Sequence, residues 1–180
     1  MAYLGYLYRL LLGAWIGAIL CFAGMVAPAL FRVLGRDQAG AVVREVLPRF
    51  DAFALGTGVI LMALSLLAEG GRGRSLVRVA LLAAMTALVA ASLFGITPRM
   101  EAIRREAGGA IAALEPTHPL RRAFGRMHGV STLLMLGQLL LGAAALGIPI
   151  REKPAAASAS PAAAPQPSER PPETVLEERR

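Results

Sequence analysis

Polar side chains that could do chemistry lie inside or at the ends of long apolar runs in this sequence. In and just before the last run, His128, Ser131 and Gln138 recur at helical spacing, so they share one face of a helix. Asp51 stands at the start of an earlier run. Polar groups are costly in lipid and usually face a partner or a cavity. A functional site would therefore be built from these residues.

We predict a polar cluster at one membrane face, made of Asp51, Arg99, Arg126, His128 and Ser131. A carboxylate at that depth favours pairing with a cation, so we expect Asp51 to pair with Arg99 or Arg126. Alternatively, Asp51 simply reaches water at the head groups. Ser131 and Gln138 could hydrogen-bond between helices, with His128 marking the lipid boundary, instead of forming a conduction path or ligand site.

The sequence contains none of the phosphate-loop, dinucleotide, zinc-protease or nucleophile-elbow motifs, so we expect neither an enzyme nor a cofactor. Each apolar run holds one methionine, and Cys21 lies one turn from Met25, but the methionines stand at different depths. We therefore predict no metal site. His118 precedes Pro119, which favours a capping role at the start of a helix over haem ligation.

The composition points to a membrane. The 180 residues are 56% hydrophobic and 17% charged, whereas a soluble domain has roughly 45–50% apolar and about 25% charged residues. A net charge of +7 could suggest nucleic acid, but aromatic stacking platforms are missing and the arginines lie between apolar runs. There they would meet lipid phosphates and fix topology, so we expect no nucleic-acid partner.

Four apolar runs, at residues 10–31, 52–68, 79–98 and 129–150, are long enough to span a bilayer. They must be helical, because an open strand in lipid leaves its backbone groups unpaired. The first run is too long for a signal peptide and lacks a small-residue cleavage site. The sequence predicts an all-α fold: a four-helix transmembrane domain over 1–153 and a disordered tail rich in proline and alanine over 154–180.

The connections should contain short amphipathic helices. Asp37 is placed to cap one that Pro48 ends, and this helix should lie along the membrane surface. The third span should continue beyond Pro98. Glycines at the four-residue spacing, such as Gly13 and Gly17, favour close helix contacts.

Several short motifs carry a family resemblance: residues 27–31 (APALF), 39–40 (AG), 97–98 (TP), and Phe124 followed by 127–131 (MHGVS). Their order and their positions at span ends resemble the transmembrane protein 205-like family, also catalogued as a domain of unknown function (4149), over about residues 8 to 148. The resemblance implies a four-helix membrane protein with no established activity. Met135 stands where that family tends to show asparagine.

We expect a non-catalytic membrane scaffold or accessory protein. The alternative is a small-solute or metal-ion transporter, or a channel-like module, acting as an oligomer. The expected partners are the lipid bilayer and either a second copy or another membrane protein. Lys153 is the only lysine among many arginines, which suggests a bacterial protein of the plasma (inner) membrane. Arginines are more numerous in the first and third connections, which the positive-inside rule places in the cytoplasm.

Overall fold

The computed structural model describes residues 2–69 and 73–148, and these form helices with no strand among them. The tail predicted over 154–180 lies outside the described residues. The elements follow one another along the chain as α1 (Ala2–Cys21), η1 (Phe22–Val26), α2 (Ala27–Val33), α3 (Arg36–Glu69), α4 (Arg74–Ala90), η2 (Ala91–Ile96), α5 (Thr97–Glu106), η3 (Ile111–Ala113) and α6 (Pro119–Leu146).

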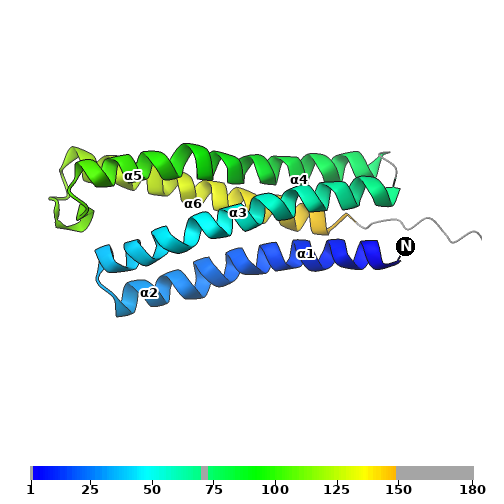
Figure 1. Cartoon of the computed structure of the whole chain (residues 1–180), viewed down its shortest axis with the longest axis horizontal. Coiled ribbons are helices and arrows are strands. Elements are labelled where there is room, and N and C mark those ends of the chain that lie inside the picture. Colours follow the sequence, from blue (N-terminus) through cyan, green and yellow to red (C-terminus); the bar gives the residue numbers. More distant parts are fainter. Residues whose placement is uncertain (1, 70–72, 149–180) are drawn as a thin grey trace, which may run out of the picture.

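These elements make four rods that lie along one common direction (Figure 1). The first rod joins α1, the π-helix η1 and α2, and the third joins α4, the π-helix η2 and α5. The rods contain four stretches long and apolar enough to cross a membrane: Tyr3–Val33, Arg36–Ala68, Ser75–Glu106 and Pro119–Leu146. The prediction of an all-α protein with four transmembrane helices is confirmed, and the chain is built as a multi-pass membrane protein.

The predicted surface helix before Pro48 does not exist as a separate element. α3 runs without interruption through Pro48, and Ala39 in its first part is fully buried. A proline inside a helix removes one backbone hydrogen bond and crowds the preceding turn. Here the Arg49 side chain donates a hydrogen bond to the carbonyl of Glu45 in that turn. α3 thus continues through Pro48 to Glu69.

The third rod extends past Pro98, as predicted, because a proline in the first turn of a helix loses no hydrogen bond that the helix needs. It ends at Glu106, earlier than the apolar pattern indicated. Gly108 and Gly109 follow with φ angles of +67° and +89°, a region that side chains disfavour. The chain turns back there, crosses through η3 and enters α6.

The core is formed by apolar side chains from the four rods, with Trp15 and Leu12 of α1 fully buried at its centre. α3 packs on α4, α4 on α6, and α1 on both α3 and α6. The predicted glycine contacts are wrong: Gly13 and Gly17 face outward with no atom near enough to touch an added Cβ. Gly58 is the glycine that lets two helices approach, since an added Cβ would lie 2.2 Å from Oγ1 of Thr86.

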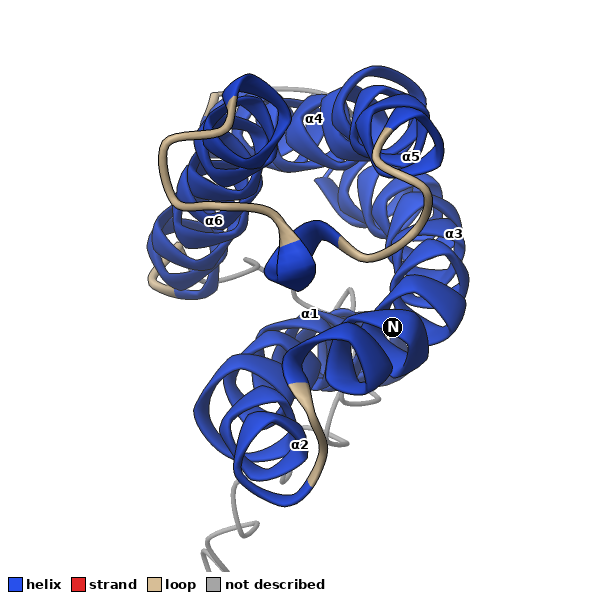
Figure 2. Cartoon of the chain, turned by 90° about the vertical axis from the view of Figure 1, so that its left-hand side faces the viewer, coloured by secondary structure: helices blue, strands red, loops and turns tan. Residues whose placement is uncertain are grey.

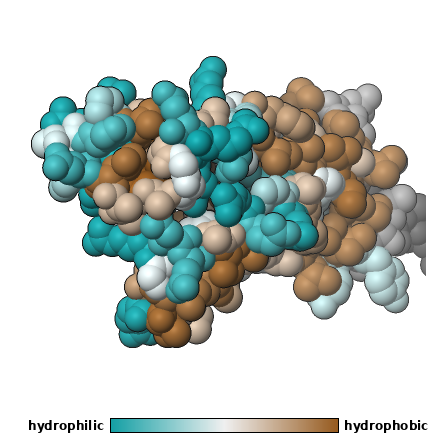
Figure 3. Space-filling model, turned by 60° about the vertical axis from the view of Figure 1, so that its left-hand side comes forward, coloured by the Kyte–Doolittle hydropathy of each residue, from teal (hydrophilic) through white to brown (hydrophobic). Residues whose placement is uncertain are grey.

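The bundle is open at the end away from the N-terminus. In the end-on view α2 stands apart from α6, and the loop containing η3 lies between them (Figure 2). Hydrophilic residues gather at this end of the molecule, while the sides of the bundle are hydrophobic (Figure 3). We refer to it as the arginine-rich end because the arginines of the first and third connections, which include Arg36, Arg44, Arg104 and Arg121, lie there.

Candidate functional site

A pocket of about 460 Å³ opens at the arginine-rich end. Its walls come from η1 and α2, the first part of α3, α5, η3 and the first turns of α6. It is lined by Phe22, Ala27, Phe31, Arg36, Asp37, Gly40, Val43, Arg44, Leu47, Pro48, Thr97, Met100, Glu101, Arg104, Ile111, Ala112, Arg121, Phe124, Gly125 and His128. The volume falls within the range of roughly 300–1,000 Å³ that is usual for small-molecule sites.

Helix α6 enters the pocket at a fixed register because its start is capped. His118 is the N-cap residue, and its Nδ1 accepts a hydrogen bond from the backbone N–H of Leu120 at 3.3 Å. This confirms the predicted capping role of His118. From that start, Arg121, Phe124 and His128 fall three, four and seven residues apart, so they project from one face of α6 into the pocket.

The floor of the pocket is apolar. Phe22 and Phe31 come from the first rod, Leu47 from α3 and Met100 from α5. The Phe22 ring is stacked near that of Phe50, with 6.5 Å between the ring centres and 21° between the planes. Such a surface favours a ligand with a hydrocarbon portion.

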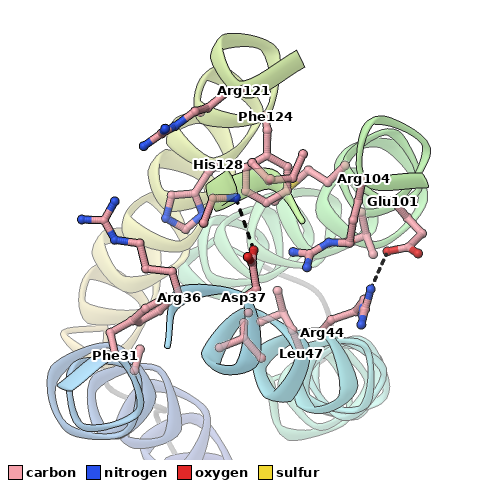
Figure 4. Close-up of a pocket in the computed structure, with 18 of the residues that line it drawn as sticks. Phe31, Arg36, Asp37, Arg44, Leu47, Glu101, Arg104, Arg121, Phe124 and His128 are labelled. Carbon is pink, nitrogen blue, oxygen red and sulfur yellow. Dashed lines mark hydrogen bonds and ion pairs between the residues drawn. The ribbon is translucent and has the colours of Figure 1, made fainter. Parts of the chain in front are cut away.

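The upper part of the pocket carries charge, with four arginines and two carboxylates among the lining residues. Arg44 of α3 forms an ion pair with Glu101 of α5 at 3.7 Å. The guanidinium of Arg104 lies over the Phe124 ring, 5.4 Å from its centre, in the geometry of a cation–π contact. These two contacts tie α5 to α3 and to α6 across the pocket (Figure 4).

The loop between α5 and α6 is anchored to the pocket wall from both sides. Asp37 Oδ1 accepts a hydrogen bond from the backbone N–H of Ala112 at 3.3 Å, and Arg121 donates to the carbonyl of Leu114 at 2.5 Å. Ile111, the first residue of η3 in this loop, is itself buried. Asp37 thus binds a segment distant in sequence, and the prediction that it caps its own helix is wrong. The N–H groups of the short η3 segment need an acceptor that its backbone does not supply.

Asp51 lies one turn deeper than the pocket floor residues Leu47 and Pro48 and is only 4% exposed. Its carboxyl group is hydrogen-bonded to the side chain of Ser92, which the π-helix η2 turns toward α3. Its Oδ2 atom has no hydrogen-bond partner among the described residues. The ion pairs in this part of the chain are Arg44–Glu101 and Arg49–Glu45, so the expected pairing of Asp51 with an arginine is not formed.

The structure does not gather the predicted cluster at one point. Arg99 and Arg126 are exposed and do not line the pocket, and Ser131 is half-buried on α6. His128 does line the pocket, although its side chain is largely exposed. Whether Asp51 and these four residues act together in function stays a prediction.

Sequence reasoning missed most of the pocket residues. Arg36, Arg44, Glu101 and Arg104 lie in two connections that the sequence treats as membrane-surface segments. His128 is the pocket residue that belongs to the predicted cluster, and Arg121 stands seven residues before it on the same helical face. A pocket made by two connections cannot be found from either one alone.

Among the described residues, no three His, Cys, Asp or Glu side chains are grouped so that they could hold a metal ion. Cys21 is exposed and Met25 is 69% exposed, while Met85 is buried in the core. Met25 therefore stands apart from Met85, and Met62 and Met135 pack with Met85 in the apolar core.

Comparisons with known proteins give a family without an assigned activity. Residues 10–109 match the family described as "Domain of unknown function (DUF4149)". An "Uncharacterized protein" from Aquifex aeolicus (strain VF5) is 32% identical over 131 residues, which make up 73% of this chain and 85% of that relative. No solved structure matches. The family match covers nearly all of α1 through α5 and ends before η3 and α6.

Proposed function

Because this chain belongs to the family of the domain of unknown function DUF4149, we propose a function from its own geometry: a non-catalytic accessory membrane protein that holds an amphipathic molecule from the bilayer. The observation that carries the proposal is the pocket at the arginine-rich end, whose floor is apolar and whose upper part is charged. A molecule with a polar head and a hydrocarbon portion matches both parts at once.

The position of the pocket supports a ligand that arrives from lipid. The walls belong to the same rods that are long and apolar enough to cross a membrane. The charged residues lie at the end of those rods, where the head groups of a bilayer would be. A membrane amphiphile would reach this depth without leaving the bilayer.

The acidic groups of the lining have structural roles. Both carboxylates are engaged: Glu101 with Arg44, and Asp37 with the backbone of Ala112. A general base needs a carboxylate or imidazole free to accept a proton from the reacting group, and the lining offers the exposed imidazole of His128 for that role. The proposal of a non-catalytic role therefore rests on the two carboxylates, which hold the pocket walls together.

A pair of neighbouring valines tests the proposal. Val43 lines the pocket, whereas Val42 is 39% exposed on the outer side of α3. We expect Val43→Trp to fill the pocket and reduce the lipid retained by the full chain after mild detergent extraction, as measured by native mass spectrometry. Val42→Trp should retain lipid as the unmodified protein does. Equal retention by both variants would contradict a ligand in this pocket.

A transport role in an oligomer is a second proposal, favoured by polar side chains buried along the interior of the bundle. Asp51 and Thr57 of α3 and Gln138 of α6 are each about 4% exposed, and Ser65 is fully buried. Solute flux into liposomes that contain the protein, lost in Gln138→Leu, would support it. We also propose that the protein lies in a bacterial plasma membrane and that, within its family, it resembles the transmembrane protein 205-like proteins.

A further inference from the structure

We infer that the pocket selects an anionic, phosphate-bearing lipid head group, and that Arg36 and Arg121 are the residues that bind it. The inference rests on the proposed function, since it names the ligand class of the same pocket. It follows from how the four arginines of the lining are engaged. Arg44 and Arg104 make contacts between helices through an ion pair and a cation–π contact. Arg121 gives one N–H to the Leu114 carbonyl, and no hydrogen bond or ion pair of the Arg36 side chain is formed among the described residues.

Arg44 and Arg104 are occupied. The Arg44 guanidinium is paired with Glu101, so its charge is balanced within the wall. Arg104 lies over the Phe124 ring and beside Gly40, where an added Cβ would come within 3.4 Å of Arg104 Nη2. The glycine thus leaves room for the guanidinium next to α3. These two arginines hold the rods together and shape the pocket.

Arg36 and Arg121 have donors left for a ligand. Within residues 2–69 and 73–148, Arg36 makes no hydrogen bond or ion pair. Arg121 uses Nη1 for the Leu114 carbonyl, and a guanidinium carries five N–H donors. Two arginines with free donors form forked contacts with phosphate oxygens better than any other pair of side chains.

The two side chains come from different parts of the chain but extend the same way. Arg36 begins α3 and Arg121 lies in the first turn of α6, and both point to the same side of the pocket (Figure 4). The Phe31 ring lies on that side too. A lipid whose phosphate is held there would place its hydrocarbon portion beside the apolar floor. A free phosphate ion would leave that floor uncovered.

The balance of charge favours an anion over a zwitterion. The lining has four arginines against Asp37 and Glu101, and Glu101 is already paired. Asp37 is the one carboxylate near the proposed head-group site, and it accepts the Ala112 N–H. A choline head group would bring its own positive charge among the four arginines, whereas a glycerol head group would not.

The test measures head-group preference in the full-length protein. Phosphatidylglycerol and phosphatidylcholine with identical acyl chains are titrated into the delipidated protein in detergent, and bound lipid is counted by native mass spectrometry. We expect a preference for phosphatidylglycerol of about tenfold or more, because both lipids offer the same phosphate but the choline of phosphatidylcholine would add a cation among four arginines. Arg36→Gln with Arg121→Gln should reduce this preference to near equality.

A matched control removes the same charge from the same end of the bundle. Arg99 and Arg126 are exposed and do not line the pocket, so Arg99→Gln with Arg126→Gln should keep the preference. Equal loss in both double variants would overturn the inference, because the preference would then reflect surface charge. The Arg36 side chain has no hydrogen bond or ion pair to lose among the described residues. Arg36→Gln alone therefore tests the site even if Arg121→Gln fails to fold. An unchanged lipid preference in Arg36→Gln would overturn the role of Arg36.

Four further outcomes bear on the inference, and the first two separate it from the proposed function. Equal binding of both lipids by the unmodified protein would refute head-group selection while leaving amphiphile binding intact. Binding of neither lipid would refute the proposed function as well. Inorganic phosphate that displaces phosphatidylglycerol at similar concentration would show a site for free anions and overturn the lipid assignment. Phosphate that fails to displace the lipid supports it.

Discussion

Replacing Gly58 by alanine should destabilise the bundle at the contact between α3 and α4. A Cβ at this position would lie 2.2 Å from Thr86 Oγ1 and 3.3 Å from Thr86 Cβ. The threonine cannot turn away freely, because Oγ1 donates a hydrogen bond to the Leu82 carbonyl at 2.8 Å and β-branched residues have few rotamers in a helix. The two helices would have to move apart.

The magnitude follows from two destabilising terms and one stabilising term. Overpacking of this kind costs about 1–3 kcal/mol, and loss of the Thr86–Leu82 hydrogen bond would add about 0.5–1.5 kcal/mol. Alanine favours the helix over glycine by about 1 kcal/mol. We expect a net loss of about 1–3 kcal/mol in the free energy of unfolding. Gly56→Ala, on the same helix with no atom within 4 Å of the added Cβ, should be neutral or slightly stabilising.

The protein reports its own unfolding, because Trp15 is the single tryptophan and is fully buried. Its fluorescence during heating in detergent gives the melting temperature of each variant. Thr86→Ala removes Oγ1, so the double variant with Gly58→Ala should regain part of the lost stability, and the double-mutant cycle measures the coupling. Equal melting temperatures for Gly58→Ala and Gly56→Ala would refute the register of α3 against α4.

Three other predictions use the same assay. Asp51→Asn should change the melting temperature little, because an amide oxygen can still accept a hydrogen bond from Ser92. Asp51→Ala should cost about 1–3 kcal/mol in the free energy of unfolding, because it leaves the Ser92 hydroxyl unpaired. Equal losses in the two variants would point to a charge partner of Asp51 instead. Exchanging Arg44 and Glu101 should preserve stability. Glu101→Arg alone should lower the free energy of unfolding, by no more than about 1 kcal/mol because the pair is exposed. A swap that destabilises as much as the single change would contradict the ion pair. Truncation after Lys153 should leave membrane insertion and melting unchanged, because the sequence beyond it offers little apolar surface to bury; loss of inserted protein in membrane fractions would show otherwise.

The number and character of the helices could be predicted from the sequence because they depend on local composition. A run of about 20 apolar residues spans a bilayer whatever its neighbours are. The cap at His118 was equally local, since a residue before a proline seldom continues a helix and the proline suits the first helical turn. Gln138 is buried, in line with the expectation that polar residues inside apolar runs turn away from lipid, whereas neither an ion pair nor head-group water was the surrounding that the structure gives Asp51.

The faces on which the helices meet were harder to predict. In a soluble protein the apolar face of a helix turns inward. In lipid the outer face is just as apolar, so the apolar pattern of a helix no longer indicates which face contacts another helix. Gly13 and Gly17 match the spacing of a contact motif and face outward, while Gly58 carries the closest approach. Only the packing of α3 on α4 distinguishes these glycines.

The sequence by itself determined that this protein has four helices long and apolar enough to cross a membrane, and where its polar residues stand along each of them. The tertiary structure alone decided that α3 runs through Pro48, that Asp37 binds Ala112, and that Arg44 pairs with Glu101. Each of these depends on bringing the first and third connections together at one end of the bundle. Hydrophobicity depends on residues adjacent in the sequence, so it predicts the spans. The pocket is made of side chains from connections that are separated by entire spans, and they come together only when the rods pack.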